Sequence, residues 1–234
     1  MDAYEKLLSK LQLSESDFAE FGLDSILPID VDVKKAQWEK IKETALDKNG
    51  ILYIRKYGKQ GVNSKWFKTL NESIFECQIE EDKNNNTYPS QTLNKHTHYR
   101  KNSTSKKTKF TPIFNYQISH LFGRTKNPLL FTSLWNLAYI PRHFDPFTGH
   151  ESKGNTSEAI RNAFKKRVLE ENAFFIEDYN RFYNEFIHPK LEQAIGDVRV
   201  EHSLNETQLK SFTDAAKGEL SPITLENLFH ETDN

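Results

Sequence analysis

Residues 114–154 read FNYQISHLFGRTKNPLLFTSLWNLAYIPRHFDPFTGHESKG, and this stretch decides how the centre of the chain is built. Residues 114–121 alternate between apolar and polar side chains, which predicts a strand that ends at His120. The polar residues over 123–133 predict a loop, and residues 137–140 predict a second short strand. The expected order is therefore strand, loop and strand.

A short helix is expected after the second strand. Asp145 followed by Pro146 is typical of a helix cap with proline at the first helical position. Gly154 predicts the end of that helix, which would run over about 146–153 and carry His150.

The flanking sequence predicts helices on both sides of this centre. Apolar residues at three- and four-residue steps predict a long helix after Gly154, which ends at Pro189, and its aromatic stripe is expected to be core. Residues 80–109 are polar and predict a loop or weak hairpin. Further helices are expected over 4–11, 16–21, 32–46 with Asp32 as cap and Gly50 as stop, 63–76, 206–216 and 224–230, with a strand over 51–54.

These elements predict an α+β fold that is mainly helical and contains a small ββα motif. The expected regions are 1–82, helical with a short strand; 83–154, basic with the ββα motif; and 155–234, helical. At 234 residues, they are expected to pack as one compact domain.

Composition narrows the cellular setting. The chain has 36% hydrophobic and 28% charged residues and no apolar run near 18 residues, and its first residues, MDAYEKLLSK, do not resemble a signal peptide. We therefore expect a cytoplasmic protein. The single Cys77 excludes an intramolecular disulfide and a Cys-rich zinc cluster, and it is expected to be a small core residue.

Charge is distributed unevenly along the chain. Residues 83–144 contain ten Lys or Arg and no Asp or Glu, whereas residues 1–82 hold 12 basic against 16 acidic side chains and residues 145–234 hold 10 against 17. We call residues 83–144 the acid-free window. Its positive field favours a polyanionic partner, and nucleic acid is the commonest one.

The pattern of His120, Asn136 and His150, spaced 16 and 14 residues apart, resembles the HNH nucleases of the ββα-metal, or His-Me finger, superfamily. The resemblance covers about 40 of the 234 residues. It implies that His120 is the general base that activates water, that Asn136 fixes the intervening loop, and that His150 binds one divalent metal, Mg²⁺ or Mn²⁺.

The remaining metal ligands are left open by the sequence. Many HNH proteins have Asp or Glu directly before the catalytic histidine, whereas this chain has Ser119. Asp145, Glu151 and His143 are the other candidate ligands near the helix. Asp145 has a competing role as a helix cap, and His143 can equally be a loop histidine without a ligand.

The hypothesis for function is a metal-dependent DNA endonuclease acting on double-stranded DNA, and the resemblance, together with the size of the chain, implies a type II restriction enzyme. A homodimer would place two sites with two-fold symmetry. The alternatives are a non-catalytic nucleic-acid-binding protein and an RNA-directed toxin nuclease. The predicted phosphate contacts are Lys95, Arg100, Lys101, Lys106, Lys107, Lys109, Arg124, Lys126 and Arg142.

Overall fold

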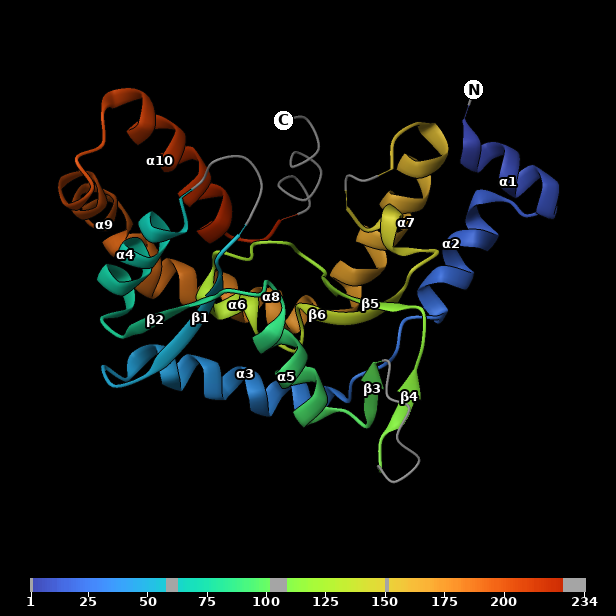
Figure 1. Ribbon diagram of the computed structural model, residues 1–234, viewed down its shortest axis with the longest axis horizontal. Helices are drawn as coiled ribbons and strands as arrows, with labels where there is room; N and C mark the ends of the chain where they lie inside the picture. Colours follow the sequence, from blue (N-terminus) through green and yellow to red (C-terminus); the bar gives the residue numbers. More distant parts are fainter. Residues whose placement is uncertain (1, 58–62, 102–108, 150–151, 225–234) are drawn as a thin grey trace.

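The computed structural model has a mainly helical α+β fold (Figure 1), as the sequence predicts. It describes residues 2–57, 63–101, 109–149 and 152–224. The α-helices among these residues are α1 (Ala3–Leu11), α2 (Glu15–Asp24), α3 (Val31–Leu46), α4 (Ser64–Phe75), α5 (Thr87–His96), α6 (Pro128–Phe131), α7 (Asn155–Glu171), α8 (Ala173–Phe182), α9 (His188–Glu201) and α10 (Glu206–Leu220). A 3₁₀ helix, η1 (Asp145–Phe147), precedes α7, and a π-helical turn, η2 (Tyr183–Ile187), joins α8 to α9.

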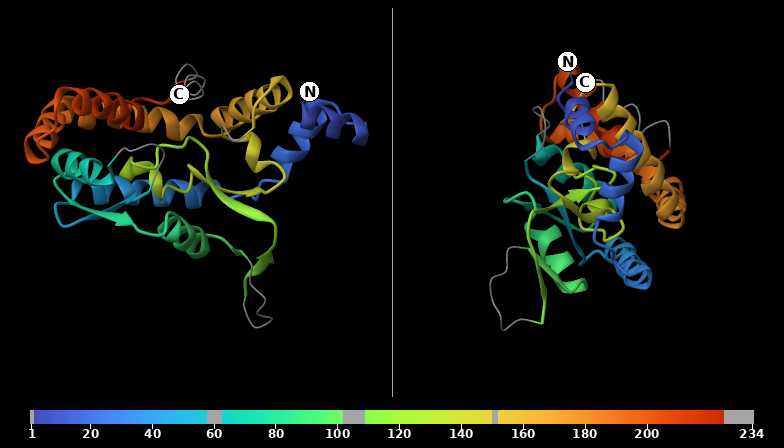
Figure 2. Two further views of the ribbon diagram at one scale, coloured as in Figure 1. Left: turned by 45° about the horizontal axis from the view of Figure 1, so that its top comes forward. Right: turned by 90° about the vertical axis from the view of Figure 1, so that its right-hand side faces the viewer.

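The strands form separate two-stranded pairs within the described residues. The central pair is antiparallel, and its position between the helices on either side is seen in Figure 1. The β3–β4 pair extends away from the body of the molecule (Figure 2). The pairs are β1 (Ile51–Arg55) with β2 (Gln78–Asp82), parallel; β3 (Tyr99–Lys101) with β4 (Thr111–Ile113), parallel; and β5 (Tyr116–His120) with β6 (Leu137–Pro141), antiparallel.

Side-chain caps account for several helix starts. The Asp2 carboxylate accepts a hydrogen bond from Tyr4 N at 2.8 Å, and Ser14 forms a capping box that begins α2. The prediction that Asp32 caps the third helix is wrong by two residues. Asp30 occupies that position, because its carboxylate accepts from the backbone N–H groups of Asp32 and Val33.

The loop prediction for 80–109 is wrong over α5. The buried Asp82 carboxylate accepts hydrogen bonds from Asn84 N and Tyr88 N, each at 3.0 Å, and so orients the first turn of this helix. Leu93 is its fully buried apolar anchor. Tertiary burial of one leucine and a carboxylate contact therefore override the polar composition.

The short helix expected over 146–153 is also absent from its described part. Only η1 forms there, with Asp145 as its first residue rather than as the cap of an α-helix. Gly154 does not end a helix but precedes α7 with a φ of 102°, a left-handed region conformation that favours glycine. His150 lies outside the described residues.

Pro189 does not end the C-terminal helical run. The chain stays helical through η2, and Pro189 falls in the first turn of α9, directly after this π-helical turn. The expected helix over 206–216 is confirmed as α10, and the one over 224–230 lies almost entirely outside the described residues.

The largest core cluster includes side chains from all of the regions 1–82, 83–154 and 155–234. Trp135 connects two helices in this cluster: its ring lies edge-on to Trp38 of α3 and is stacked on Phe175 of α8, with centroids 5.6 Å and 5.8 Å apart. Phe175 and Tyr179 of the aromatic stripe are buried, as predicted, although Phe174 is exposed.

Among the described helices, none combines the length and apolar character that crossing a membrane requires.

Candidate functional site

His120 is the last residue of β5, where it pairs with Leu137 of β6. Its Nε2 lies 3.0 Å from the carbonyl oxygen of Phe131, and the two rings stack with centroids 5.4 Å apart and an interplanar angle of 6°. A carbonyl oxygen only accepts hydrogen bonds, so Nε2 must carry the hydrogen of the neutral ring. Nδ1 is then unprotonated and can accept a proton.

The surroundings of His120 keep its imidazole neutral. The pKa of His120 is lowered to about 3, first by burial and then by the positive charge of Arg55, while the hydrogen bond to Phe131 opposes this shift. The residue as a whole is nevertheless partly exposed to solvent. At neutral pH the ring is therefore an uncharged hydrogen-bond acceptor at Nδ1.

Asn136 fixes the loop between β5 and β6 from inside the protein. The residue is fully buried, and its Oδ1 accepts a hydrogen bond from Phe122 N at 2.8 Å. Its Nδ2 donates to the carbonyl oxygens of Leu130 at 3.0 Å and Gly123 at 3.3 Å. One amide thus joins both ends of the loop, including the turn that presents the Phe131 carbonyl to His120.

A second asparagine begins the helical turn of this loop. Asn127 caps α6 through a hydrogen bond from Leu129 N to its Oδ1 at 3.0 Å. Its Nδ2 donates to the hydroxyl of Tyr179 at 2.8 Å, which connects the loop to α8. Because both ends of α6 are bonded to buried partners, the position of the Phe131 carbonyl is defined before any ligand binds.

The described metal-ligand candidates do not meet at His120. Tyr116 pairs with Pro141 at the opposite end of the β5–β6 pair, about 14 Å away at the rise of roughly 3.4 Å per residue. His143 and Asp145 follow Pro141 and so lie at that far end, where His143 stacks on Phe21 with centroids 5.4 Å apart.

Ser119 neighbours His120 but faces the other side of the strand. Within residues 2–57, 63–101, 109–149 and 152–224, no group of three or more His, Cys, Asp or Glu could hold a metal ion. Ser119, His143 and Asp145 therefore do not fit one metal site together, and His150 and Glu151 lie outside the described residues.

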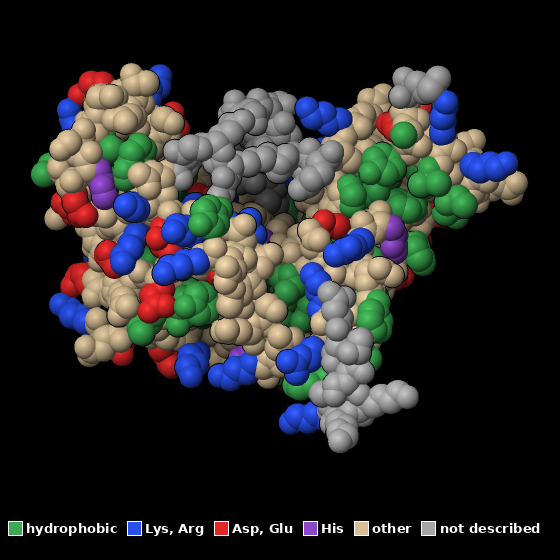
Figure 3. Space-filling model, in the orientation of Figure 1, with side chains coloured by type: hydrophobic (Ala, Val, Ile, Leu, Met, Phe, Trp, Pro, Cys, Tyr) green, Lys and Arg blue, Asp and Glu red, His purple; other side chains and the backbone are tan. Residues whose placement is uncertain are grey.

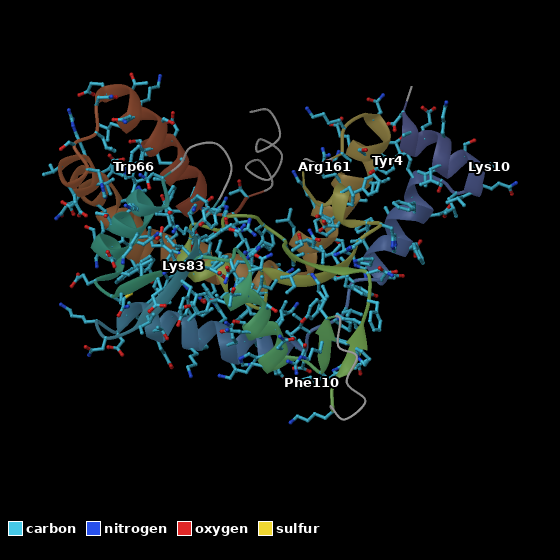
Figure 4. The ribbon with its side chains drawn as sticks, viewed as in Figure 1. Tyr4, Lys10, Trp66, Lys83, Phe110 and Arg161 are labelled. Atoms are coloured by element: carbon cyan, nitrogen blue, oxygen red, sulfur yellow. The ribbon has the colours of Figure 1, made fainter. Side chains whose placement is uncertain are left out.

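Part of the predicted basic surface is placed for contact with a polyanion. Lys95, Arg100, Lys109 and Arg142 are exposed, and Lys101 is partly exposed. Figure 3 shows Lys and Arg side chains along the lower part of the face that carries α5 and β3. The Arg100 guanidinium lies 5.6 Å from the ring centroid of Phe110, which Figure 4 labels near β3 and β4. Lys106 and Lys107 lie outside the described residues.

Arg124 and Lys126 are instead part of the interior. Each is 4% exposed. The Arg124 guanidinium donates to the carbonyl oxygens of Ser221 and Pro222, and Lys126 Nζ donates to those of Arg55 and Lys56. Burial lowers the pKa of Lys126 to about 8. Their charged groups join separate chain segments inside the protein. The prediction that Arg124 and Lys126 contact phosphates is therefore wrong.

Arg55 is the residue near the site that sequence reasoning missed. It ends β1, its backbone N–H donates to Thr125 O at 2.9 Å, and its charge acts on His120. Charge patterning could not find it, since it lies among mixed charges outside the acid-free window. An arginine at the end of a buried strand is the signal that was available.

The fold and site define a mainly helical α+β protein with a neutral, loop-oriented histidine at the end of its central strand pair. The chain belongs to the family described as "Uncharacterised protein PM1201", whose model matches residues 29–225. It is 33% identical over 195 residues to a Pasteurella multocida relative, "Uncharacterized protein PM1201", a match that covers 82% of this chain and 85% of the relative. No solved structure matches the chain. The family match leaves out α1 and α2, which lie N-terminal to residue 29.

Proposed function

We propose that this protein is a metal-dependent DNA endonuclease of the HNH type in which His120 is the general base. The observation that supports this most is the contact between His120 Nε2 and the Phe131 carbonyl, because it leaves Nδ1 as the proton acceptor. The loop contacts of Asn136 are those that the HNH resemblance implies for that residue.

In the proposed step, Nδ1 of His120 takes a proton from water as the water oxygen bonds to phosphorus. The bond from phosphorus to the leaving oxygen breaks, and that oxygen takes a proton from solvent. Such general-base assistance contributes about 10²- to 10⁴-fold in rate. A pKa of about 3 makes His120 a weak base in the free protein, but the negative charge of a bound phosphate would raise it.

The proposed requirement for Mg²⁺ or Mn²⁺ comes from the HNH resemblance. The described candidates Ser119, His143 and Asp145 do not form one site, so no step of the reaction is assigned to a metal held by them. The exposed residues Lys95, Arg100, Lys101, Lys109 and Arg142 are the proposed contacts to the backbone of double-stranded DNA. A homodimer remains part of the restriction-enzyme hypothesis.

Plasmid cleavage tests the proposal. Wild type and His120→Ala are incubated with supercoiled DNA and Mg²⁺, Mn²⁺ or a chelator. We expect nicking and linearisation by the wild type in at least one metal, and a rate at least about 100-fold lower in the variant. His120→Gln is a second variant that keeps more of the side-chain volume, and His188→Ala, at an exposed position on α9, is the control.

The non-catalytic alternative is supported by the exposed basic residues Lys95 of α5, Arg100 of β3 and Lys109, which do not depend on His120. It predicts salt-sensitive DNA binding by wild type and His120→Ala alike, with no cleavage in any metal. That outcome would exclude the endonuclease. The same assay with a structured RNA separates an RNA-directed nuclease from a DNA endonuclease.

A further inference from the structure

Arg55 is a partly buried cation whose guanidinium is incompletely bonded. Its Nη2 donates to Oδ1 of Asn86 at 3.0 Å, whereas its Nε is buried and has no hydrogen-bond partner among the described residues. The ion pairs found in the described part of the chain do not include Arg55. A buried donor that lacks an acceptor costs roughly 1–3 kcal/mol, so such a group needs an explanation.

The two carboxylates whose charges act on Arg55, Asp82 and Glu219, accept hydrogen bonds from other groups. Asp82 accepts from two backbone N–H groups through both of its oxygens, and Oε2 of Glu219 accepts from Lys126 N at 2.8 Å. Both raise the pKa of Arg55 from a distance, but burial is the larger effect and lowers it. Arg55 is therefore a partly desolvated positive charge, and no carboxylate of the described residues forms an ion pair with it.

The backbone of Arg55 is fixed against the loop that holds His120. Its N–H donates to Thr125 O at 2.9 Å, and its carbonyl accepts from Lys126 Nζ. Asn86, which precedes α5, holds the guanidinium from the other side. The arginine and the histidine are thus parts of one bonded unit formed by β1, the loop and the start of α5.

We infer that the partly exposed Arg55 guanidinium binds a phosphate group beside His120. This inference rests on the proposed function and names the residue that would hold the phosphate next to the base. Guanidinium and phosphate form strong charge-assisted hydrogen bonds. His120 is neutral and therefore carries no charge that would repel the phosphate. Arg55 supplies the positive charge that holds it.

The proximity of Arg55 to His120 makes the basicity of His120 depend on whether a phosphate is bound. While the site is free of phosphate, the charge of Arg55 disfavours protonation of His120. A phosphate at Arg55 neutralises that charge and adds a negative one, which raises the proton affinity of Nδ1. His120 would therefore become an effective base only when a phosphate is in place.

Inorganic phosphate is the first probe. Long-range ¹H–¹⁵N spectra of the histidine rings are recorded at pH 7 during a phosphate titration, with chloride at equal ionic strength as the comparison. The His120 signals are assigned as those lost in His120→Gln. We expect a saturable shift of the His120 ring nitrogens in the wild type and at least about tenfold weaker binding in Arg55→Gln.

A short DNA duplex is the second probe, followed by fluorescence anisotropy at several salt concentrations. Arg55→Gln is expected to lower the slope of log K against log salt by about 1. Arg199→Gln, which removes a charge from an exposed ion pair between α9 and α10, should change this slope much less. Arg55→Lys keeps the charge and serves as the second variant if Arg55→Gln does not fold.

The outcomes separate this inference from the proposed function. If phosphate does not shift the His120 ring in the wild type, or shifts it equally in Arg55→Gln, then the inference is wrong. A response to phosphate alone, with an unchanged slope for the duplex, would overturn the assignment to a nucleic-acid phosphate. If both probes respond but the wild type cleaves no nucleic acid, the phosphate site stands and the endonuclease does not.

Discussion

The ring of His120 lies parallel to that of Phe131, and its Nε2 bonds to the carbonyl of the same residue at 3.0 Å. A single residue of the loop therefore sets both the plane and the tautomer of the histidine. Phe131 in turn is fully buried at the end of α6, so packing in the core determines the orientation of the His120 ring. This makes the orientation of His120 testable through residues that never touch a substrate.

Phe131→Leu should remove the stacking while keeping the backbone carbonyl. We expect the free energy of unfolding to fall by about 1–3 kcal/mol, less than the 3–5 kcal/mol typical of Phe→Ala. Cleavage should fall further than this loss of stability explains, because the ring of His120 gains freedom. Phe122→Leu is the matched control, since Phe122 is also buried but its ring contacts Trp135. Equal losses of activity in both variants would argue against an orienting role for Phe131.

Asn136→Ala should destabilise the protein strongly. The substitution leaves Phe122 N and the carbonyls of Gly123 and Leu130 without their partner in a buried loop. Unpaired buried groups cost about 1–3 kcal/mol each, so a loss of at least about 2 kcal/mol is expected in urea denaturation. Asn184→Ala, at an exposed site in η2, should change stability by less than about 0.5 kcal/mol. A neutral Asn136→Ala would show that the loop is not held from inside.

The pH dependence of His120 has a defined sign. Its folded-state pKa of about 3 lies below the unfolded value of about 6.5, so its contribution to stability is complete above about pH 6.5. That contribution is lost as the pH falls toward about 3, with a slope of at most about 1.4 kcal/mol per pH unit. His120→Gln should flatten this part of the stability curve, measured by denaturation at a series of pH values. A titration of His120 near pH 6.5 in the folded wild type would contradict the shift.

The sequence predicts elements that are built from local patterns and misses those that depend on distant partners. The strands over β5 and β6 were predictable because alternation and a terminal proline are local signals. The helix α5 was not, because its polar sequence has few apolar positions and depends on Asp82 and on burial of Leu93. For Pro189 the local signal was present but ambiguous. Proline is found after the end of a helix and also in the first turn of a helix, and here it lies in the first turn of α9.

In the candidate site, too, some residues were predictable from local sequence and others depend on distant contacts. His120 and Asn136 were named from their order along the chain, whereas the inward direction of Arg124 and Lys126 could not be read from their charge. Their cationic groups bond to backbone carbonyls of segments up to 98 residues away in sequence. The same limit explains Arg55, whose proximity to His120 is created by the pairing of β1 with the loop near Thr125.

The packing of α2, which lies outside the family match, gives the sharpest test of the fold. A Cβ atom added at Gly22 would lie 2.0 Å from Cδ2 of Phe144, a fully buried ring next to η1. Gly22→Ala should therefore force α2 away from this ring and lower the free energy of unfolding by about 1–3 kcal/mol. The usual gain in helix propensity from glycine to alanine, about 1 kcal/mol, only partly offsets this clash.

Gly218→Ala is the matched control for Gly22→Ala, because an added Cβ meets nothing within 4 Å at that position of α10. Propensity alone then applies, and we expect stabilisation by about 0.5–1 kcal/mol. Urea denaturation of both variants should give changes of opposite sign. If Gly22→Ala stabilises the protein as Gly218→Ala does, then α2 does not pack on Phe144 in solution, and the contact that joins this helix to the family core is wrong.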